Sequence, residues 1–265
     1  MRRYVFFALS MWWMPLSATA SASDNPKTIH IVGNNWCPYN CDASAAEQGY
    51  MIDIARRALS KHGYQVLYSN VPWSRAIEET RSGKYHAIVS AANDDAPDFT
   101  FPTQSLGRIQ NQFYVMRGNP WRFRTFDDLN AVRLGAIADY AYTQELDDYI
   151  ARNRKNMQRV QLVFGDTPLK LNVRKLLKGR IDTLAEDASV MQYFLKQKSL
   201  GEEIIPAGEI HNADGKFLYL YIAFSPRLSN GEKLAELIAN EVQAMRKSGE
   251  LSALLSTYGV ADWNR

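Results

Sequence analysis

The stretch GYMIDIARRALSKHG at residues 49–63, followed directly by YQVLY at residues 64–68, decides the fold. Apolar residues of the first part recur at helical spacing, at Met51, Ile52, Ala55 and Leu59. This spacing predicts an amphipathic helix, and Gly63 is a typical C-terminal stop because glycine readily adopts the left-handed conformation that ends helices. The second part is typical of a β-strand, so the stretch predicts a helix that leads into a strand.

The same pattern extends on both sides of this stretch. Thr28–Val32 alternates in polarity and predicts a first strand. Pro72 and Trp73 open a second helix, which Gly83 ends, and Tyr85–Ser90 predicts a third strand. The order strand–helix–strand–helix–strand is typical of a mostly parallel sheet flanked by helices.

A second α/β unit follows the break at Gly118-Asn-Pro120. Its predicted strands and helices alternate, with strands at 132–137, 160–163 and 181–184 and helices at 142–153, 168–177 and 188–197. Two extended segments, near residues 112–118 and 216–224, are the predicted crossings between the units. Helices at 232–246 and 249–257 are predicted to close the chain. The sequence therefore predicts an α/β protein with two units of similar architecture.

The N-terminus has the three parts of a secretory signal peptide. Two arginines at residues 2–3 precede an apolar run at residues 4–16, and small residues follow as far as Ala20 and Ala22, the predicted cleavage sites. A membrane anchor is the alternative, but the run is shorter than the roughly 20 residues that span a bilayer. Residues 1–22 are therefore predicted to be a signal peptide, and the mature protein is expected in the periplasm without spanning the membrane.

The chain has two cysteines, Cys37 and Cys41, in the sequence WCPYNC. An exported chain meets an oxidising compartment, and the intervening Pro-Tyr-Asn turn can bring the two sulfur atoms together. A disulfide here would stiffen the loop that carries Trp36 and Tyr39. Buried free thiols are one alternative, and metal or redox chemistry is another, which the absence of a nearby histidine or third cysteine disfavours.

Composition and charge exclude several classes of protein. The chain has 265 residues, of which 46% are hydrophobic and 22% charged, and this excludes collagen-like, disordered and disulfide-scaffold proteins. The net charge is +3, and the lysines and arginines are scattered among acidic residues along the sequence. Nucleic-acid binders usually have a concentrated basic surface, so no nucleic-acid partner is predicted. The four histidines lack metal-ligand spacing, and there is no phosphate loop, G-x-S-x-G or H-E-x-x-H motif. The sequence therefore predicts no cofactor, no metal and no enzymatic activity.

Eight short motifs occur in order along the chain: WCPY (36–39), GYMIDIAR (49–56), PWSRA (72–76), SGKYHAI (82–88), FTFP (99–102), LGAI (134–137), GRID (179–182) and SGEL through YG (248–259). Together they resemble the bacterial extracellular solute-binding proteins of family 3, over nearly all of residues 28–260. Each motif is weak by itself, whereas their order and spacing are specific. The PW-x-R-A motif is similar to that of a stand-alone branch of the family.

The resemblance implies a periplasmic binding protein type 2 fold, in which two lobes joined by two strands close over a ligand by a hinge motion. Lobe one would comprise residues 23–115 and 222–265, and lobe two residues 116–221. It also implies a small polar solute as ligand and an inner-membrane ABC permease or a membrane sensor as partner. A monomer is expected.

The resemblance implies a ligand site at strand carboxyl ends and helix amino ends. Its expected residues in lobe one are Trp36, Tyr39, Trp73, Arg75, Ser90, Ala91 and Asn93. Its expected residues in lobe two are Asp139, Tyr140, Tyr142, Thr143, Glu186 and Asp187. Asp187 is the preferred acid, because the matching family residue pairs with the ammonium group of the ligand, and Glu186 is the neighbour that could be confused with it.

Several of these residues also have a purely structural interpretation. Trp36 and Tyr39 could pack under their loop, and Arg75 could form a surface salt bridge with a neighbouring glutamate. Thr143 and Asp187 could cap the helices that follow them. The sequence leaves these alternatives open.

The stretch NDDAP at residues 93–97 departs from the family pattern. Amino-acid binders of the family carry an arginine there, typically in T-x-x-R, whereas this chain has Asp94 and Asp95. Two carboxylates disfavour a ligand carboxylate beside them. Either Arg75 or Arg108 replaces the missing arginine, or the ligand is an amine-bearing or neutral polar molecule.

These observations predict a periplasmic protein that binds an amino acid or related amine for ABC-type uptake. One alternative is a ligand-sensing co-receptor for a membrane signalling protein. Another is a dehydratase on the same fold, with Glu186 or Asp187 as its general acid.

Overall fold

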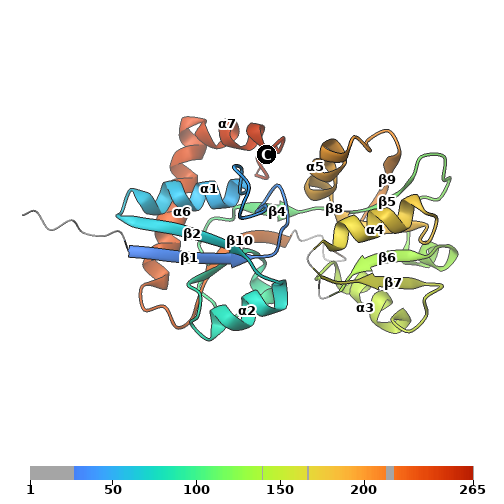
Figure 1. Ribbon diagram of the computed structural model, residues 1–265, viewed down its shortest axis with the longest axis horizontal. Helices are drawn as coiled ribbons and strands as arrows, with labels where there is room; N and C mark the ends of the chain where they lie inside the picture. Colours follow the sequence, from blue (N-terminus) through green and yellow to red (C-terminus); the bar gives the residue numbers. More distant parts are fainter. Residues whose placement is uncertain (1–26, 139, 166, 213–217, 265) are drawn as a thin grey trace, which may run out of the picture.

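The computed structural model describes residues 27–138, 140–165, 167–212 and 218–264, which form two lobes side by side (Figure 1). Each lobe is built on one five-stranded sheet. The predicted two-lobed α/β fold is thereby confirmed. The predicted signal peptide at residues 1–22 lies outside the described residues.

The sheet of the first lobe has the strand order β2-β1-β3-β10-β4. Its strands are β1 (Lys27–Gly33), β2 (Tyr64–Asn70), β3 (Ala87–Ala91), β4 (Gly107–Ile109) and β10 (Leu218–Phe224). β1 pairs in parallel with β2 and β3, whereas β10 pairs antiparallel with β3 and β4. Only β10 therefore runs against the other four strands, so the sheet is mostly parallel, as predicted.

Within the described residues, the first lobe has four α-helices and a short 3-10 helix: α1 (Tyr50–Ser60), α2 (Trp73–Arg81), α6 (Gly231–Ser248), α7 (Glu250–Thr257) and η1 (Asn93–Asp95). Apolar residues of α1, α6 and α7 form one core with the sheet, and α2 covers a second core on the other face. α1 follows Gly49, whose φ is 103°, and a Cβ at this position would lie 2.4 Å from the Cα of Asn40. Only glycine fits both this conformation and this close approach.

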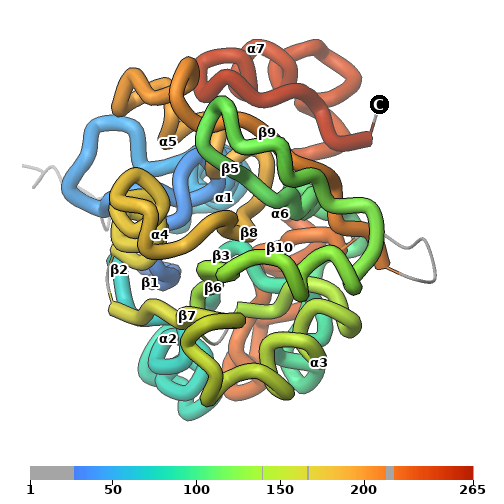
Figure 2. Tube along the Cα trace, turned by 90° about the vertical axis from the view of Figure 1, so that its right-hand side faces the viewer, coloured from blue at the N-terminus to red at the C-terminus, as the bar shows by residue number. Residues whose placement is uncertain are grey.

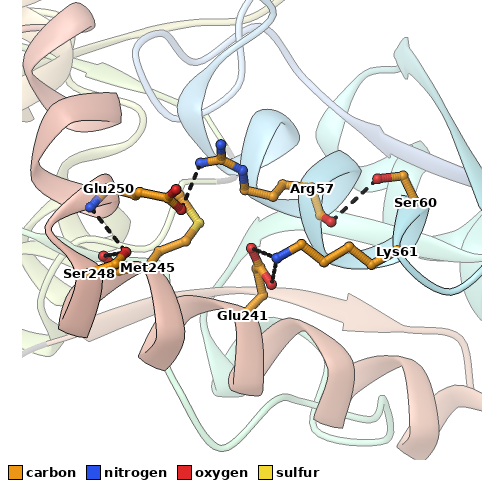
Figure 3. Close-up of polar contacts among 7 residues, drawn as sticks. All are labelled: Arg57, Ser60, Lys61, Glu241, Met245, Ser248 and Glu250. Atoms are coloured by element: carbon orange, nitrogen blue, oxygen red, sulfur yellow. Dashed lines mark hydrogen bonds and ion pairs between the residues drawn. The ribbon is translucent and has the colours of Figure 1, made fainter.

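Ion pairs attach the C-terminal helices to the region of α1 (Figure 3). The Nζ of Lys61 donates hydrogen bonds to both carboxylate oxygens of Glu241 on α6, each at 2.7 Å. The guanidinium of Arg57 lies 3.3 Å from the carboxylate of Glu250 on α7. These contacts add to the apolar packing that returns the end of the chain to the first lobe.

The sheet of the second lobe has the order β7-β6-β8-β5-β9. Its strands are β5 (Asn111–Met116), β6 (Leu134–Ile137), β7 (Val160–Val163), β8 (Thr183–Asp187) and β9 (Ile204–Glu209). β6 pairs in parallel with β7 and β8, and β5 pairs antiparallel with β8 and β9. The second sheet therefore repeats the arrangement of the first, with β5 in the place of β10.

The helices of the second lobe are α3 (Gln144–Asn153), α4 (Pro168–Leu177), α5 (Ala188–Lys198) and the 3-10 helix η2 (Phe126–Ala131). α3 and α5 lie on opposite sides of the sheet, as the end-on view shows (Figure 2). α3 shares an apolar cluster with Phe113 and Val115, and α4 and α5 share another with Tyr114 and Leu184. Both faces of the second sheet are thus covered.

The chain crosses between the sheets at two places. β4 ends at Ile109 and β5 begins at Asn111, so Gln110 alone separates a strand of the first sheet from one of the second. The return crossing lies between Glu209 and Leu218, partly outside the described residues. The sequence predicted the crossings near residues 112–118 and 216–224, the segments that contain most of β5 and β10. Each of these strands belongs to a single sheet, so the chain crosses just before each of them.

Several elements differ from the sequence-based expectation, among them the short strand β4 and the two 3-10 helices, which the sequence did not predict. The strand predicted at residues 181–184 is β8 at Thr183–Asp187, so Glu186 and Asp187 end the strand instead of following it. β9 was not predicted, because its Pro206 and Gly208 are residues that strands disfavour. β9 tolerates Pro206 because it lies at the edge of the sheet, and Gly208, with a φ of 142°, lies where the register of the pairing with β5 shifts.

Candidate functional site

A cavity of about 310 Å³ lies between the two lobes. From lobe one it is lined by Asn34, Trp36, Trp73, Ser90, Ala92, Asp94 and Asp95. From lobe two it is lined by Tyr140, Ala141, Tyr142, Gln144, Asp147 and Glu186. The crossings and β10 contribute Ile109, Asn111, Asn212, Leu218 and Leu220. Much of this lining follows the carboxyl ends of β1, β3, β6 and β8, where α/β sheets bind ligands.

Glu186, near the end of β8, is the most deeply buried acid of this lining, with 2% of its surface exposed. Its Oε1 accepts hydrogen bonds from the indole N–H of Trp36 at 3.3 Å and from the backbone N–H of Asp187 at 2.9 Å. Its Oε2 is buried and has no hydrogen-bond partner among the described residues. Burial raises the pKa of Glu186 to about 8, with a further contribution from the charge of Asp187, so this carboxyl is mostly protonated at neutral pH.

Asp187, the next residue, is 1% exposed and has a different environment. Its Oδ1 caps α5 by accepting the backbone N–H groups of Ser189 and Val190, at 3.0 and 3.1 Å, and it also accepts the hydroxyl of Tyr39 at 3.0 Å. Its Oδ2 accepts the backbone N–H of Gln110 at 2.9 Å. Burial raises its pKa to about 6 although these hydrogen bonds favour the charged form, so Asp187 is mostly ionised at neutral pH.

Aromatic rings form much of the apolar lining. The rings of Trp36 and Tyr140, from different lobes, meet edge to face with centroids 6.2 Å apart. Tyr142 lies beside Tyr140, with centroids 6.3 Å apart, and Trp73 lines the cavity from the start of α2. The side-chain amide of Asn34 donates to the hydroxyl of Tyr140 at 2.9 Å, so this bond and the Trp36–Glu186 bond both link the two lobes.

Three further carboxyl groups, those of Asp94, Asp95 and Asp147, line the cavity. Asp95 accepts the backbone N–H of Ala92 at 2.8 Å, and burial raises its pKa. Asp147 on α3 accepts the backbone N–H of Tyr142 at 3.3 Å, and burial raises its pKa to about 6. Among the described lining residues there is no lysine or arginine.

Ser90, near the end of β3, has a φ of 61°, which is rare for a residue other than glycine. Its hydroxyl donates to the side-chain oxygen of Asn40 at 2.6 Å, which holds the residue against the loop that follows β1. Strained backbone of this kind occurs most often at functional sites. The residue was selected from the sequence, whereas its conformation emerges only from the structure.

Six residues that the sequence selected line the cavity: Trp36, Trp73, Ser90, Tyr140, Tyr142 and Glu186. Asp139, also selected, lies outside the described residues.

The remaining six selected residues are described, but they are not part of the lining: Tyr39, Arg75, Ala91, Asn93, Thr143 and Asp187. Tyr39 is 1% exposed and packs beneath its loop, and Asp187 caps α5. Arg75 is exposed on α2. The pKa of its neighbour Glu79 is lowered mainly by a hydrogen bond with Lys84, with a smaller contribution from the charge of Arg75. Thr143 caps α3 by accepting the backbone N–H of Leu146. The structural alternatives for Tyr39, Thr143 and Asp187 are therefore all present in the fold.

Sequence reasoning missed several lining residues, among them Asn34, Asn111 and Asp147. Asn34 directly follows β1, so the rule that ligands bind at strand carboxyl ends could have identified it. Asn111 and Asp147 carry no such signal. Asn111 begins β5, directly after the crossing at Gln110, and Asp147 lies in the first turn of α3, so neither follows the carboxyl end of a strand. Asp94 and Asp95 were noted as a departure from the family pattern, and they do face the cavity.

Cys37 and Cys41 form the predicted disulfide. Their loop borders a second cavity of about 390 Å³, which is also lined by Leu169 on α4 and Phe194 on α5. Trp36 and Tyr140 line both cavities, so these two rings form a wall between them.

The described part of the chain contains no group of three or more histidine, cysteine, aspartate or glutamate side chains that could hold a metal ion. None of its helices combines the length and the apolar character that crossing a membrane requires.

The two sheets, the short crossing and the cavity between the lobes define a protein with the periplasmic binding protein type 2 fold. The family model of the bacterial extracellular solute-binding proteins, family 3, matches residues 29–261, and the chain belongs to this family. The resemblance noted in the sequence is thereby confirmed, together with a role in binding a solute. No curated protein sequence matches the chain.

Solved structures show the same fold at low sequence identity. A histidine kinase sensor domain with similarity to periplasmic binding proteins is 19% identical, with a TM-score of 0.68 over 89% of this chain and 97% of that chain. An arginine-specific periplasmic binding protein of Salmonella typhimurium is 16% identical, with a TM-score of 0.66 over 88% of this chain and 100% of that chain. An ancestral amino acid-binding protein, described as a precursor of cyclohexadienyl dehydratase, is 16% identical, with a TM-score of 0.65 over 87% and 95% of the two chains.

Proposed function

We propose that this protein binds a small polar solute, an amino acid or a related amine, in the cavity between its lobes and delivers it to an ABC-type importer. The observation that carries the proposal is the buried, unpartnered Oε2 of Glu186 in a cavity lined from both lobes. Buried polar groups are normally hydrogen-bonded, so an oxygen of this kind points to a partner that the described chain does not supply. Membership of a solute-binding family supports the same function.

In this proposal the ligand joins the two lobes. Aromatic rings of Trp36 and Trp73 from lobe one and of Tyr140 from lobe two cover it, and Glu186 of lobe two accepts a hydrogen bond from it. A ligand held by both lobes stabilises the closed arrangement, because its contacts are complete only when the lobes are together. The single-residue crossing at Gln110 is a natural hinge for this motion.

The proposed place of action is the periplasm. The signal-peptide pattern of residues 1–22 supports export, and the disulfide between Cys37 and Cys41 is typical of an oxidising compartment. Structural similarity to amino acid-binding proteins, such as the arginine-specific periplasmic binding protein of Salmonella typhimurium, supports an amino acid or a related compound as the ligand class.

A ligand-sensing co-receptor is the second candidate function, and the fold shared with a histidine kinase sensor domain favours it. The two functions differ in the partner of the closed, ligand-bound protein. Cross-linking in whole cells, followed by identification of the captured membrane protein, separates them, since a permease indicates uptake and a sensor kinase indicates signalling.

The experiment that tests solute binding is native mass spectrometry of the exported protein, purified without refolding. A retained small molecule would be weighed directly, and small-angle scattering would then show a smaller radius of gyration with that molecule than without it. A screen of amino acids, amines and neutral polar solutes that shifts neither the melting temperature nor the scattering profile would rule the proposed function out.

A further inference from the structure

Apart from the tyrosines, the titratable side chains that line the cavity in the described part of the chain are all carboxyl groups. Asp94 and Asp95 line it from lobe one, and Asp147 and Glu186 line it from lobe two. No described lining residue is a lysine or arginine. Arg75 and Arg108, the two candidates to replace the arginine that family amino-acid binders use, are not part of the described lining either. The cavity therefore combines four carboxyl groups with no described cationic side chain.

This pattern is unsuitable for the carboxylate of an amino acid. Carboxylate ligands are usually held by a two-point arginine clamp or by several N–H donors. Here a ligand carboxylate would lie among like charges, which oppose its entry. A positively charged ligand would instead pair with the carboxyl groups that line the cavity.

The buried acid in this group has an incomplete set of hydrogen bonds. Oε1 of Glu186 is engaged by Trp36 and by the backbone of Asp187, whereas Oε2 is buried without a partner among the described residues. Asp187 cannot replace it, because Asp187 already accepts four hydrogen bonds. An N–H donor with a positive charge supplies what Oε2 lacks, and the bond would be charge-assisted once Glu186 loses its proton.

The aromatic lining suits the same kind of ligand. Trp36, Trp73, Tyr140 and Tyr142 all line the cavity, and the faces of such rings attract ammonium and guanidinium groups. The carboxyl groups stand on both lobes, so a ligand with a positive group at each end can contact both at once. Such a ligand would join the lobes through charge as well as through apolar contact.

Resting on the proposed solute-binding function, we infer that the cavity takes a small dication without a carboxylate, of the α,ω-diamine or aminoalkylguanidine class, held by Glu186 and Asp147 on one lobe and Asp94 and Asp95 on the other. The ligand class thus follows from the absence of a described cation in the lining together with the open Oε2 of Glu186.

The test uses pairs of ligands that differ only by a carboxylate. Calorimetric titration of the full mature protein would compare lysine with 1,5-diaminopentane and arginine with 4-aminobutylguanidine. In each pair, the compound without a carboxylate is expected to bind at least tenfold more tightly, and neutral 1,5-pentanediol should give no binding. Equal or tighter binding of lysine and arginine would overturn this inference and leave the proposed function standing. No binding by either series or by any neutral solute would overturn both.

Variants then locate the contact. Glu186→Gln keeps the shape of the side chain but cannot become negative, so the dication is expected to bind at least tenfold more weakly. Glu236→Gln, which removes a carboxylate from the exposed side of α6, is expected to leave the affinity unchanged. Titrations at pH 7 in buffers with different ionisation enthalpies should show proton release on binding by the native protein and less release by Glu186→Gln. Native affinity and native proton release in Glu186→Gln would refute the assigned role of Glu186.

Discussion

Replacement of Glu186 by glutamine is expected to stabilise the ligand-free protein, and to do so more strongly as the pH rises. The amide oxygen of glutamine can still accept the N–H groups of Trp36 and Asp187, and its NH₂ group takes the place of the protonated oxygen. The variant therefore resembles the native protein at low pH. It differs at high pH, where the native carboxyl becomes charged in a buried position.

The size of the effect follows from the change in pKa. The pKa of Glu186 rises from 4.5, its ordinary value, to about 8 in the folded protein. Between these two values the folded state keeps the proton that the unfolded state releases, so the free energy of unfolding falls by about 1.4 kcal/mol for each pH unit. The full loss is about 5 kcal/mol by pH 8, and this is an upper limit because water that enters an opening cleft solvates the charge. Glu186→Gln is free of this loss.

The groups that face Glu186 must be the same in both proteins for the comparison to hold. Burial, and after it the charge of Asp187, raises the pKa of Glu186. Burial likewise raises the pKa values of the nearby hydroxyls of Tyr114, Tyr140 and Tyr142, and the charge of Glu186 adds to the shift. The tyrosines stay protonated from pH 5 to pH 8, and Asp187 titrates in both proteins. The difference between the two proteins therefore reports mainly on Glu186.

The assay is urea unfolding of ligand-free protein at pH 5 and pH 8, followed by tryptophan fluorescence. The stability advantage of Glu186→Gln over the native protein should be below about 1 kcal/mol at pH 5 and several kcal/mol at pH 8. Glu236→Gln should show no such growth. An advantage that is equal at both pH values, or smaller at pH 8, would refute the reasoning.

Three further predictions concern stability. Reduction of the disulfide, or its removal by Cys37→Ser with Cys41→Ser, should lower the free energy of unfolding by about 2 kcal/mol, because the bridge closes a short loop; equal urea midpoints with and without reductant would contradict this. Asp187→Ala should lower the free energy of unfolding by about 2 kcal/mol, because it removes the α5 cap and the hydrogen bond from Gln110. Thermal unfolding measures this, and a loss below about 0.5 kcal/mol, typical of a surface substitution, would contradict it. Gly49→Ala should lower the free energy of unfolding by about 3 kcal/mol, because alanine avoids this positive φ and its Cβ would clash with backbone atoms. A melting temperature within about 2 °C of the native value, roughly a change of 1 kcal/mol or less, would show instead that the loop relaxes.

Secondary structure was predictable from the sequence wherever the pattern was periodic. The helix at Tyr50–Ser60 and the strand at Tyr64–Asn70 are close to their predicted positions, because apolar spacing and a glycine stop define them. β9 was not predictable, since its strand character depends on pairing with β5 and its own residues argue against it.

The site was predictable only in part. Sequence motifs located the ends of β1, β3 and β8, and so found Trp36, Ser90 and Glu186. They favoured Asp187 over Glu186, whereas Glu186 lines the cavity and Asp187 caps α5. Successive residues of a strand point in opposite directions, so only the register of β8 tells which of the two faces the cavity. Asp147 was missed because its approach to the cavity depends on how α3 packs.

The end of β8 carries two neighbouring acids with separate tasks. Glu186 faces the cavity between the lobes. Asp187 accepts a hydrogen bond from the backbone N–H of Gln110, the single residue between the sheets at that crossing. If the lobes rotate at Gln110, as proposed, the hydrogen bond from Gln110 to Asp187 has to shift or break. Asp187 is the neighbour in sequence of Glu186, the proposed ligand contact. Opening of the lobes and release of the ligand would then be coupled through two adjacent residues of β8.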